Sequence, residues 1–335
     1  MKTSVWHRLL KTTEFYLVLV ILLVGALIST LNPEFLSLEN LLNILRRNAF
    51  LGVFALGLLP VLISGGIDVS FTAVATVAQY IMALIITTYS VDSVLLAFLI
   101  PIPIGILLGA INASIVSYTR VHPVIITIAT LNAFHGLLVF ITGGTWIYGF
   151  PASFAQFARA RLFTITTAAG RTYGVSVFIL IWLLTAVLTW FILQHTRIGR
   201  KVFAIGGNLE AARRSGFNIF GVHLFVYGFT GALAGIAAVI HTAQNQMVEP
   251  NALVGRELAV VAAVILGGAS IFGGKGTVLG TVLGVLLIGI IRNGVILVGL
   301  SSYWHQVTFG FVIVVAASIN AVQSQLRTRN PGISL

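Results

Sequence analysis

Few residues in this chain carry side chains of the types that perform chemistry. Its 335 residues include 8 Asp and Glu, 7 His and no Cys. Without cysteine there is no disulfide, no thiolate nucleophile and no thiolate metal ligand. The sequence also lacks His-Glu-x-x-His, Gly-x-Ser-x-Gly and Gly-x-x-x-x-Gly-Lys-Ser/Thr, which bind zinc, expose a nucleophilic serine and cradle nucleotide phosphates. An enzyme is therefore the weakest functional hypothesis.

The acid with the clearest functional potential is Asp68, at the edge of an apolar stretch. A carboxylate there is costly to bury, so we expect it to face protein or water. It could couple transport to protons or bind substrate, or it could cap the helix that follows. We favour the cap, because Gly65-Gly66 interrupts the chain just before it and acids favour helix N-termini. No second acid deep in another apolar stretch supports an ion-driven mechanism.

Several amides and glycines in or beside apolar stretches are candidates for a solute pathway. Amides could hydrogen-bond sugar hydroxyls, or they could join neighbouring helices, and both interpretations stay open. The spacings Gly231-x-x-x-Gly235 and Gly280-x-x-x-Gly284 predict close helix packing. The pathway or structural candidates, besides Asp68, are Gly65, Gly66, Asn112, Asn132, Gly267, Gly268 and Asn293.

The composition indicates the kind of scaffold that must position these residues. Hydrophobic residues make up 58% and charged residues 8%, and the mean hydropathy is +1.04. Soluble domains carry about a quarter charged residues, so most of this surface must face lipid. The formal charge of +11 does not indicate nucleic-acid binding, because Lys and Arg concentrate at span ends and in short loops. We predict an all-α, multi-pass membrane protein with one transmembrane domain over residues 1–335.

About 20 apolar residues are needed for a helix to cross the bilayer, and ten stretches meet or approach this length. The first is interpreted as an uncleaved span, since no cleavage signal follows it. Ten spans would divide into two halves of five, inverted relative to each other. The predicted spans are Glu14–Leu31, Asn43–Ser64, Ile67–Ser90, Val94–Ser117, Pro123–Gly143, Gly174–Gln194, Phe220–Ala243, Glu257–Phe272, Thr277–Gly299 and Tyr303–Val322.

The distribution of Lys and Arg predicts that both termini are cytoplasmic. With the N-terminus inside, 12 of the 19 basic residues fall on the cytoplasmic side, as the positive-inside rule requires. The outer loop 144–173 could fold over the membrane surface or dock an extracytoplasmic partner. The seven basic residues that oppose the rule are Arg46, Arg47, Arg159, Arg161, Arg171, Arg256 and Arg292.

A polar, basic segment, 196–216, lies between two apolar spans in the cytoplasmic loop 195–219. Asn208 is a good N-cap, Glu210 precedes the bases Arg213 and Arg214, and Gly216 can end a helix. We predict a short helix that needs a docking surface, since it is marginal alone, with Gly206-Gly207 as a flexible entry. The alternative is a solvated loop that obeys the positive-inside rule.

Three motifs resemble those of the ribose and branched-chain-type permease subunits of ATP-binding-cassette importers. Residues 205–216 (IGGNLEAARRSG) resemble the cytoplasmic loop of that family, 64–70 (SGGIDVS) its Gly-Gly-Ile-Asp-Leu-Ser segment, and 266–280 (LGGASIFGGKGTVLG) its late glycine-rich segment. Similarity extends from about Asn40 to about Ala321. The resemblance implies that residues of the short helix contact an ATPase subunit. The ATPase-coupling candidates are Gly206, Gly207, Asn208, Glu210, Ala211, Ala212, Arg213, Ser215 and Gly216.

The expected function is therefore the permease subunit of an importer for a monosaccharide or sugar-like solute in the bacterial cytoplasmic membrane. The resemblance implies three partners: ATPase subunits, a second permease that is identical or paralogous, and an extracytoplasmic solute-binding protein. No cofactor is expected in this chain, since ATP and magnesium would bind to the ATPase. The alternative is an ion-coupled secondary transporter, for which Asp68 is the one plausible intramembrane carboxylate.

Overall fold

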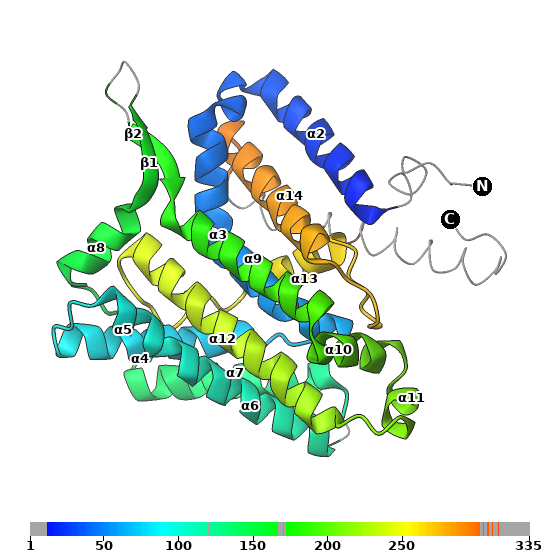
Figure 1. The fold of residues 1–335 in the computed structure, drawn as a ribbon. Helices are drawn as coiled ribbons and strands as arrows, with labels where there is room; N and C mark the ends of the chain where they lie inside the picture. Colours follow the sequence, from blue (N-terminus) through cyan, green and yellow to red (C-terminus); the bar gives the residue numbers. More distant parts are fainter. Residues whose placement is uncertain are drawn as a thin grey trace, which may run out of the picture.

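The computed structural model describes residues 12–119, 121–166, 170, 172–301 and the single positions 304, 307, 310 and 314. Helices dominate it, as predicted (Figure 1). The elements are α2 Thr13–Leu31, η1 Pro33–Leu36, α3 Leu38–Ile63, α4 Phe71–Thr88, α5 Val94–Leu99, α6 Pro101–Thr119, α7 Pro123–Thr142, α8 Ala152–Arg159, β1 Arg161–Thr166, β2 Thr172–Ser176, α9 Val177–His195, α10 Arg197–Gly207, α11 Leu209–Arg214, α12 Ile219–Asn245, α13 Glu257–Leu266 and α14 Val278–Leu297.

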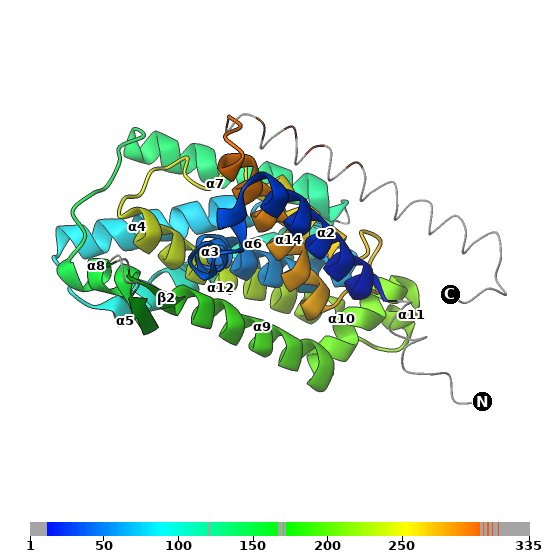
Figure 2. The same cartoon turned by 90° about the horizontal axis from the view of Figure 1, so that it is seen from above.

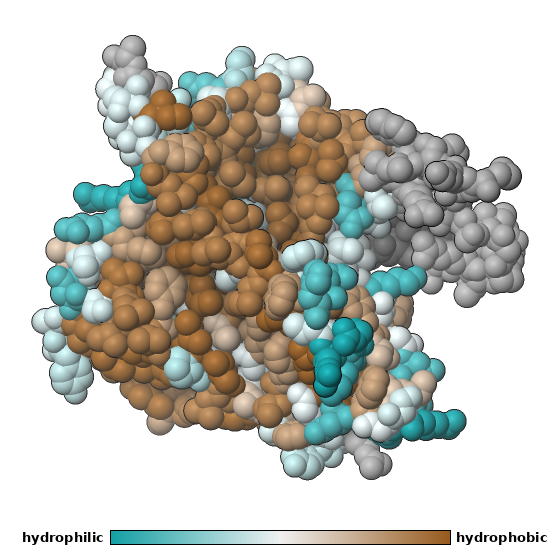
Figure 3. All heavy atoms as spheres, in the orientation of Figure 1, coloured by the Kyte–Doolittle hydropathy of each residue, from teal (hydrophilic) through white to brown (hydrophobic). Residues whose placement is uncertain are grey.

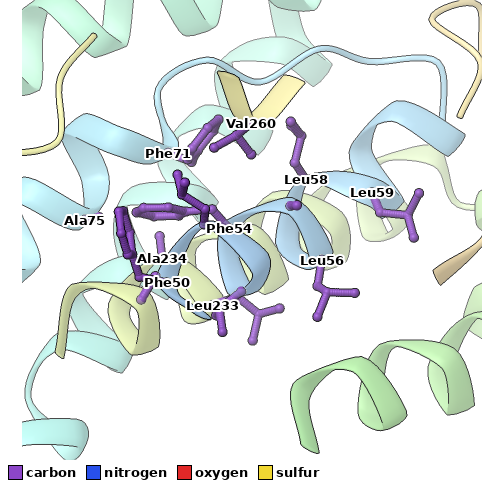
Figure 4. Close-up of a cluster of buried hydrophobic side chains, with 14 of the residues drawn as sticks. Phe50, Phe54, Leu56, Leu58, Leu59, Phe71, Ala75, Leu233, Ala234 and Val260 are labelled. Carbon is purple, nitrogen blue, oxygen red and sulfur yellow. The ribbon is translucent and has the colours of Figure 1, made fainter. Parts of the chain in front are cut away.

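Two long helices, α3 and α12, form the centre of the bundle, and α2, α6, α7 and α9 lie around them (Figure 2). In the most apolar 18-residue stretch of each helix, 83% of α3 and 67% of α12 is buried inside the bundle. The corresponding share is 17% in both α2 and α7. The core combines aromatic and aliphatic side chains of α3 with small residues of α4 and α12, including Phe54, Ala75 and Ala234 (Figure 4). The peripheral helices are apolar on surfaces that the bundle leaves uncovered, as lipid contact requires.

Glycine spacing brings helices into backbone contact, which confirms the packing prediction for both motifs. A Cβ atom at Gly231 of α12 would lie 1.9 Å from the carbonyl oxygen of Gly105 on α6. A Cβ atom at Gly280 of α14 would likewise lie 1.9 Å from the carbonyl oxygen of Gly267. Because no larger residue fits at either crossing, close approach is the reason for glycine there.

The connecting segments sort into two ends of the bundle. The α10 end holds α10, α11 and the linker 64–70, and Glu14 there accepts a hydrogen bond from Thr277 (2.6 Å). The opposite end, the hairpin end, holds α8 and the β1–β2 hairpin, and the Asn32 amide there donates to the Leu297 carbonyl (3.0 Å). This division agrees with the predicted alternation of loops between two sides of a membrane.

The span prediction is only partly confirmed. Within the described residues, eight helices are long and apolar enough to cross a membrane. The predicted span Glu257–Phe272 is wrong as a complete crossing, because α13 has 10 residues and covers about 15 Å, half of the hydrocarbon thickness. Tyr303–Val322 lies largely outside the described residues. The total of ten and the division into inverted halves therefore remain predictions.

The outer loop 144–173 folds into elements rather than an irregular loop. Residues of α8 pack inward through Phe154, which is 2% exposed and stacks on Phe150 at 5.0 Å. The antiparallel β1–β2 hairpin projects from the bundle, and every residue of β1 is exposed. Figure 3 shows hydrophilic residues at this end and around α10 and α11, with a broad hydrophobic surface between them.

Candidate functional site

Helix α10 carries the predicted coupling segment out of α9. Thr196 caps it by accepting a hydrogen bond from the Gly199 N–H (3.2 Å). Its apolar side chains Val202 and Ile205 are buried in the core. The predicted flexible entry at Gly206-Gly207 is wrong, because both glycines belong to α10. The Asn208 N–H donates to the Ala204 carbonyl (3.0 Å), so the helix continues to its junction with α11.

Helix α11 is the short capped helix that the sequence predicts. The side-chain oxygen of Asn208 accepts from the Ala211 N–H at 2.9 Å. Arg213 and Glu210 form an ion pair at 3.2 Å. Gly216 has φ +77°, and its N–H donates to the Arg213 carbonyl (3.0 Å). Local capping therefore defines both ends of α11.

One side of α11 is anchored and the other is free. Ala212 is 4% exposed and belongs to the core cluster. Leu209 is 40% exposed, and the other predicted coupling residues of this stretch, Glu210, Ala211, Arg213, Ser215 and Gly216, are also exposed. Ala212 thus fixes the helix to its own chain, while its neighbours form the accessible face.

The three family-like motifs meet at one place, which we call the glycine junction: Gly65, Gly206, Gly273 and Gly274. A Cβ atom at Gly206 would lie 1.7 Å from the Ile63 carbonyl oxygen and 2.6 Å from the Gly274 nitrogen. The Gly274 N–H donates to that same carbonyl at 2.8 Å. Gly65 and Gly273 have φ values of +86° and +88°, which favour glycine. Backbone contacts therefore connect α10 to the end of α3 and to the segment before α14.

Asp68 lies in the linker between α3 and α4 and is 2% exposed. Its carboxylate accepts from the Ser70 N–H (2.8 Å) and hydroxyl (2.6 Å). Burial raises the pKa of this carboxyl to about 6, and the hydrogen bonds from Ser70 act in the opposite direction. The N-cap position of α4 is occupied by Ser70, not Asp68, and no side chain caps the helix there. The predicted cap is therefore wrong in position: Asp68 lies two residues earlier and bonds to Ser70 itself.

The other predicted pathway candidates do not form one lining. Asn112 is fully buried and donates to the Ser70 hydroxyl (2.6 Å). Asn293 exchanges two amide hydrogen bonds with Asn40 of α3 (2.9 and 3.0 Å). Asn132 is exposed on α7. Asn112 and Asn293 join elements, and Asn293 also lines a cavity at the hairpin end, whereas Asn132 faces outward.

The remaining glycine candidates shape turns and contacts. Gly66 lies against Tyr227, where an added Cβ would be 3.1 Å from the phenol oxygen. Gly267 follows α13 and packs against Gly280, and Gly268 has φ +88°. These positions require small size or a left-handed backbone.

Glu257, the first residue of α13, is a buried acid that sequence reasoning did not select. It is 9% exposed, accepts hydrogen bonds from the Thr72 hydroxyl of α4 and from the Gly255 N–H (2.9 and 3.0 Å), and begins α13 inside the bundle. The sequence feature that could have identified Glu257 is an acid at the start of an apolar helix. It was missed because the helix was taken for a full span.

The sequence comparisons agree with this architecture. The family model described as "Branched-chain amino acid transport system / permease component" matches residues 40–317. The chain is 33% identical over 318 residues to the ribose import permease protein RbsC of Escherichia coli (strain K12), covering 95% of each chain. It is 36% identical over 300 residues to RbsC of Bacillus subtilis (strain 168), covering 89% of each.

A further relative is the galactose/methyl galactoside import permease protein MglC of Haemophilus influenzae, 32% identical over 330 residues, with 94% of this chain and 95% of the relative covered. No solved structure matches this one. The relatives are transport permeases and not enzymes. From the family match, the shared length and the membrane-spanning bundle, the chain belongs to the permease components of this transport family and is a multi-pass protein of the inner membrane.

Proposed function

We propose that this chain is the membrane-spanning permease of an ATP-binding-cassette importer for a monosaccharide or sugar-like solute. The observation that carries the proposal is the glycine junction, which connects α10 to α3 and to the segment before α14 through backbone contacts. The exposed helix α11 directly follows α10. A displacement of α11 by an ATPase subunit would pass to the centre of the bundle, because packed backbones transmit rigid-body motion. The relatives named for ribose and galactose import support the substrate class.

In this proposal the α10 end is cytoplasmic and both termini lie inside. The basic residues of 196–216 then obey the positive-inside rule. ATP and magnesium bind to the ATPase subunits, and a solute-binding protein delivers solute at the hairpin end. The second permease, identical or paralogous, covers α7, whose surface is largely unburied and carries the exposed amide Asn132.

The absence of cysteine allows a direct contact test with matched variants. Ala211→Cys places a thiol on the accessible face of α11, and Ala212→Cys places one against the core. We expect a maleimide crosslinker to join Ala211→Cys, but not Ala212→Cys, to an ATPase subunit that copurifies in mild detergent. An intact complex with no crosslink from Ala211, Leu209 or Gly216 variants would argue against coupling through α11.

Transport separates this proposal from the ion-coupled alternative. Proteoliposomes with the full complex should accumulate sugar only when ATP reaches the ATPase. Uptake driven by a proton or sodium gradient without ATP would favour the secondary transporter and would direct attention to the two buried acids, Asp68 and Glu257.

A further inference from the structure

A cavity of about 330 Å³ lies at the hairpin end, between α3, α12, the start of α13 and α14. Four arginines line it: Arg46 and Arg47 of α3, Arg256 before α13, and Arg292 of α14. All four are among the seven basic residues that oppose the positive-inside rule. This arrangement does not stabilise the fold, because the four positive charges repel one another. Arg47 repels both Arg46 and Arg292, and Arg292 repels Arg256.

The acids of the described residues offset these charges only in part. All eight acids of the sequence lie in described residues, and none lines the cavity or forms an ion pair with these arginines. Glu249 is the one carboxylate whose charge acts on Arg256. The cavity therefore has a large excess of positive charge in a partly desolvated place, where an oxyanion is strongly favoured.

The guanidinium of Arg256 is held in position. Its Nε donates to the Ala252 carbonyl (3.3 Å), and its carbon lies 5.5 Å from the ring centre of Phe50. Phe50 also packs edge-on against His241 at 5.2 Å. His241 lines the cavity, is 7% exposed, and its buried Nδ1 has no hydrogen-bond partner among the described residues. A buried polar atom without a protein partner is unusual, so the Nδ1 of His241 is available to hydrogen-bond a ligand in this cavity.

A second cavity, of about 250 Å³, continues the first toward the outer loop. The two share Arg46 and Gln244, and the Gln244 amide donates to the Arg46 carbonyl at 2.7 Å. Arg159 of α8 lines the second cavity. Positive charge thus extends from the outer-loop helix to the interior cavity, along the side from which solute is delivered in the proposed function.

We infer that the transported solute carries a carboxylate or phosphate on its sugar-like body, and that Arg46, Arg47, Arg256 and Arg292 bind this group. The inference rests on the proposed function and specifies its substrate class. Arginine side chains only donate hydrogen bonds, and their planar forks match oxyanions. A neutral sugar also presents hydroxyl donors, which four guanidiniums cannot accept. A cavity of this size suits a small solute.

Binding to the permease in nanodiscs of phosphatidylcholine alone tests the inference with matched probes: D-galacturonate against D-galactose, and ribose 5-phosphate against D-ribose. We expect at least one anionic probe to bind at least tenfold more tightly than its neutral match. Arg256→Gln and Arg292→Gln should each weaken that binding at least tenfold, and Arg292→Lys should restore part of it. Arg200→Gln removes an equal charge at the α10 end and should leave binding unchanged. A melting temperature equal to that of wild type identifies the variants that fold. If Arg292→Gln does not fold, Arg292→Lys is compared with wild type in its place.

Three results would overturn the inference. The first is equal affinity for neutral and anionic probes with no effect of the variants. The second is arginine-dependent retention of phosphatidylglycerol, in nanodiscs that contain it, without binding of either anionic sugar; the oxyanion would then be a lipid headgroup. The third is that the variants lose only association with the solute-binding protein, in which case the arginines would recognise an acidic protein surface.

Transport distinguishes failure of this inference from failure of the proposed function. ATP-driven uptake of a neutral sugar at equal rates in wild type and Arg292→Gln would refute the anionic solute and leave the importer intact. Failure of any ATPase to copurify would refute the importer, whereas the nanodisc measurement would still report on the cavity.

Discussion

Replacing Gly206 by alanine should detach the α10–α11 segment from the bundle. Without any movement, the added Cβ atom would lie 1.7 Å from the Ile63 carbonyl oxygen. Because Cβ atoms in proteins essentially never approach another atom closer than 3.0 Å, α10 and α3 must separate by about 1.3 Å. That movement also strains the hydrogen bond from the Gly274 N–H to the same carbonyl. Overpacking costs about 1–3 kcal/mol and an unmade buried hydrogen bond about 1–3 kcal/mol. We therefore expect a local loss of about 2–6 kcal/mol.

Limited trypsin digestion at Arg213 and Arg214, in nanodiscs, measures this local opening. A loss of about 2 kcal/mol raises the open population about thirtyfold, so cleavage should accelerate by at least that factor, and sugar uptake per ATP hydrolysed should fall. The matched control is Gly207→Ala, because nothing lies within 4 Å of a Cβ atom there. If both variants resist trypsin equally and transport equally, the glycine junction does not hold the segment as described.

Three further predictions concern the scaffold and the short helix. Gly231→Ala should lower the melting temperature of the purified permease by several degrees, because its Cβ meets a backbone carbonyl at 1.9 Å; Gly136→Ala, in open space, should not, and equal melting would contradict the close α6–α12 contact. Asn208→Ala should cost about 1 kcal/mol of local stability by removing the N-cap, seen as faster trypsin cleavage in α11, and unchanged cleavage would show that the cap does not matter. Thr72→Val should destabilise the permease by about 1–3 kcal/mol, since Glu257 loses a buried donor; a melting temperature equal to that of wild type would refute this role.

Features that depend on neighbouring residues were predictable. Helix α11, its cap at Asn208 and its end at Gly216 follow from a few adjacent side chains. The glycine pairs of α12 and α14 also followed from a four-residue spacing. In each case the physical cause lies within one or two helical turns, so the sequence alone contains it.

Features that depend on distant contacts were not predictable. Composition did not show that Gly65, Gly206 and Gly274 meet, because over 130 residues separate the first two. The length of α13 was overestimated at its C-terminal end, because the helix stops at Leu266 and the backbone of Gly268 takes a φ of +88°. The arginines of the hairpin end counted as exceptions to a topological rule until the fold placed four of them around one cavity.

The glycine junction also separates two tasks along the chain. Its contacts involve backbone atoms of Gly206, Ile63 and Gly274, so they do not depend on the side chains of the exposed face of α11. The residues 208–216 could therefore be exchanged between permeases, provided that the buried Ala212 is kept, while the glycine junction stays unchanged. A chimera carrying another permease's α11 on this glycine junction should accept that permease's ATPase, so that partner choice becomes a transferable module of nine residues.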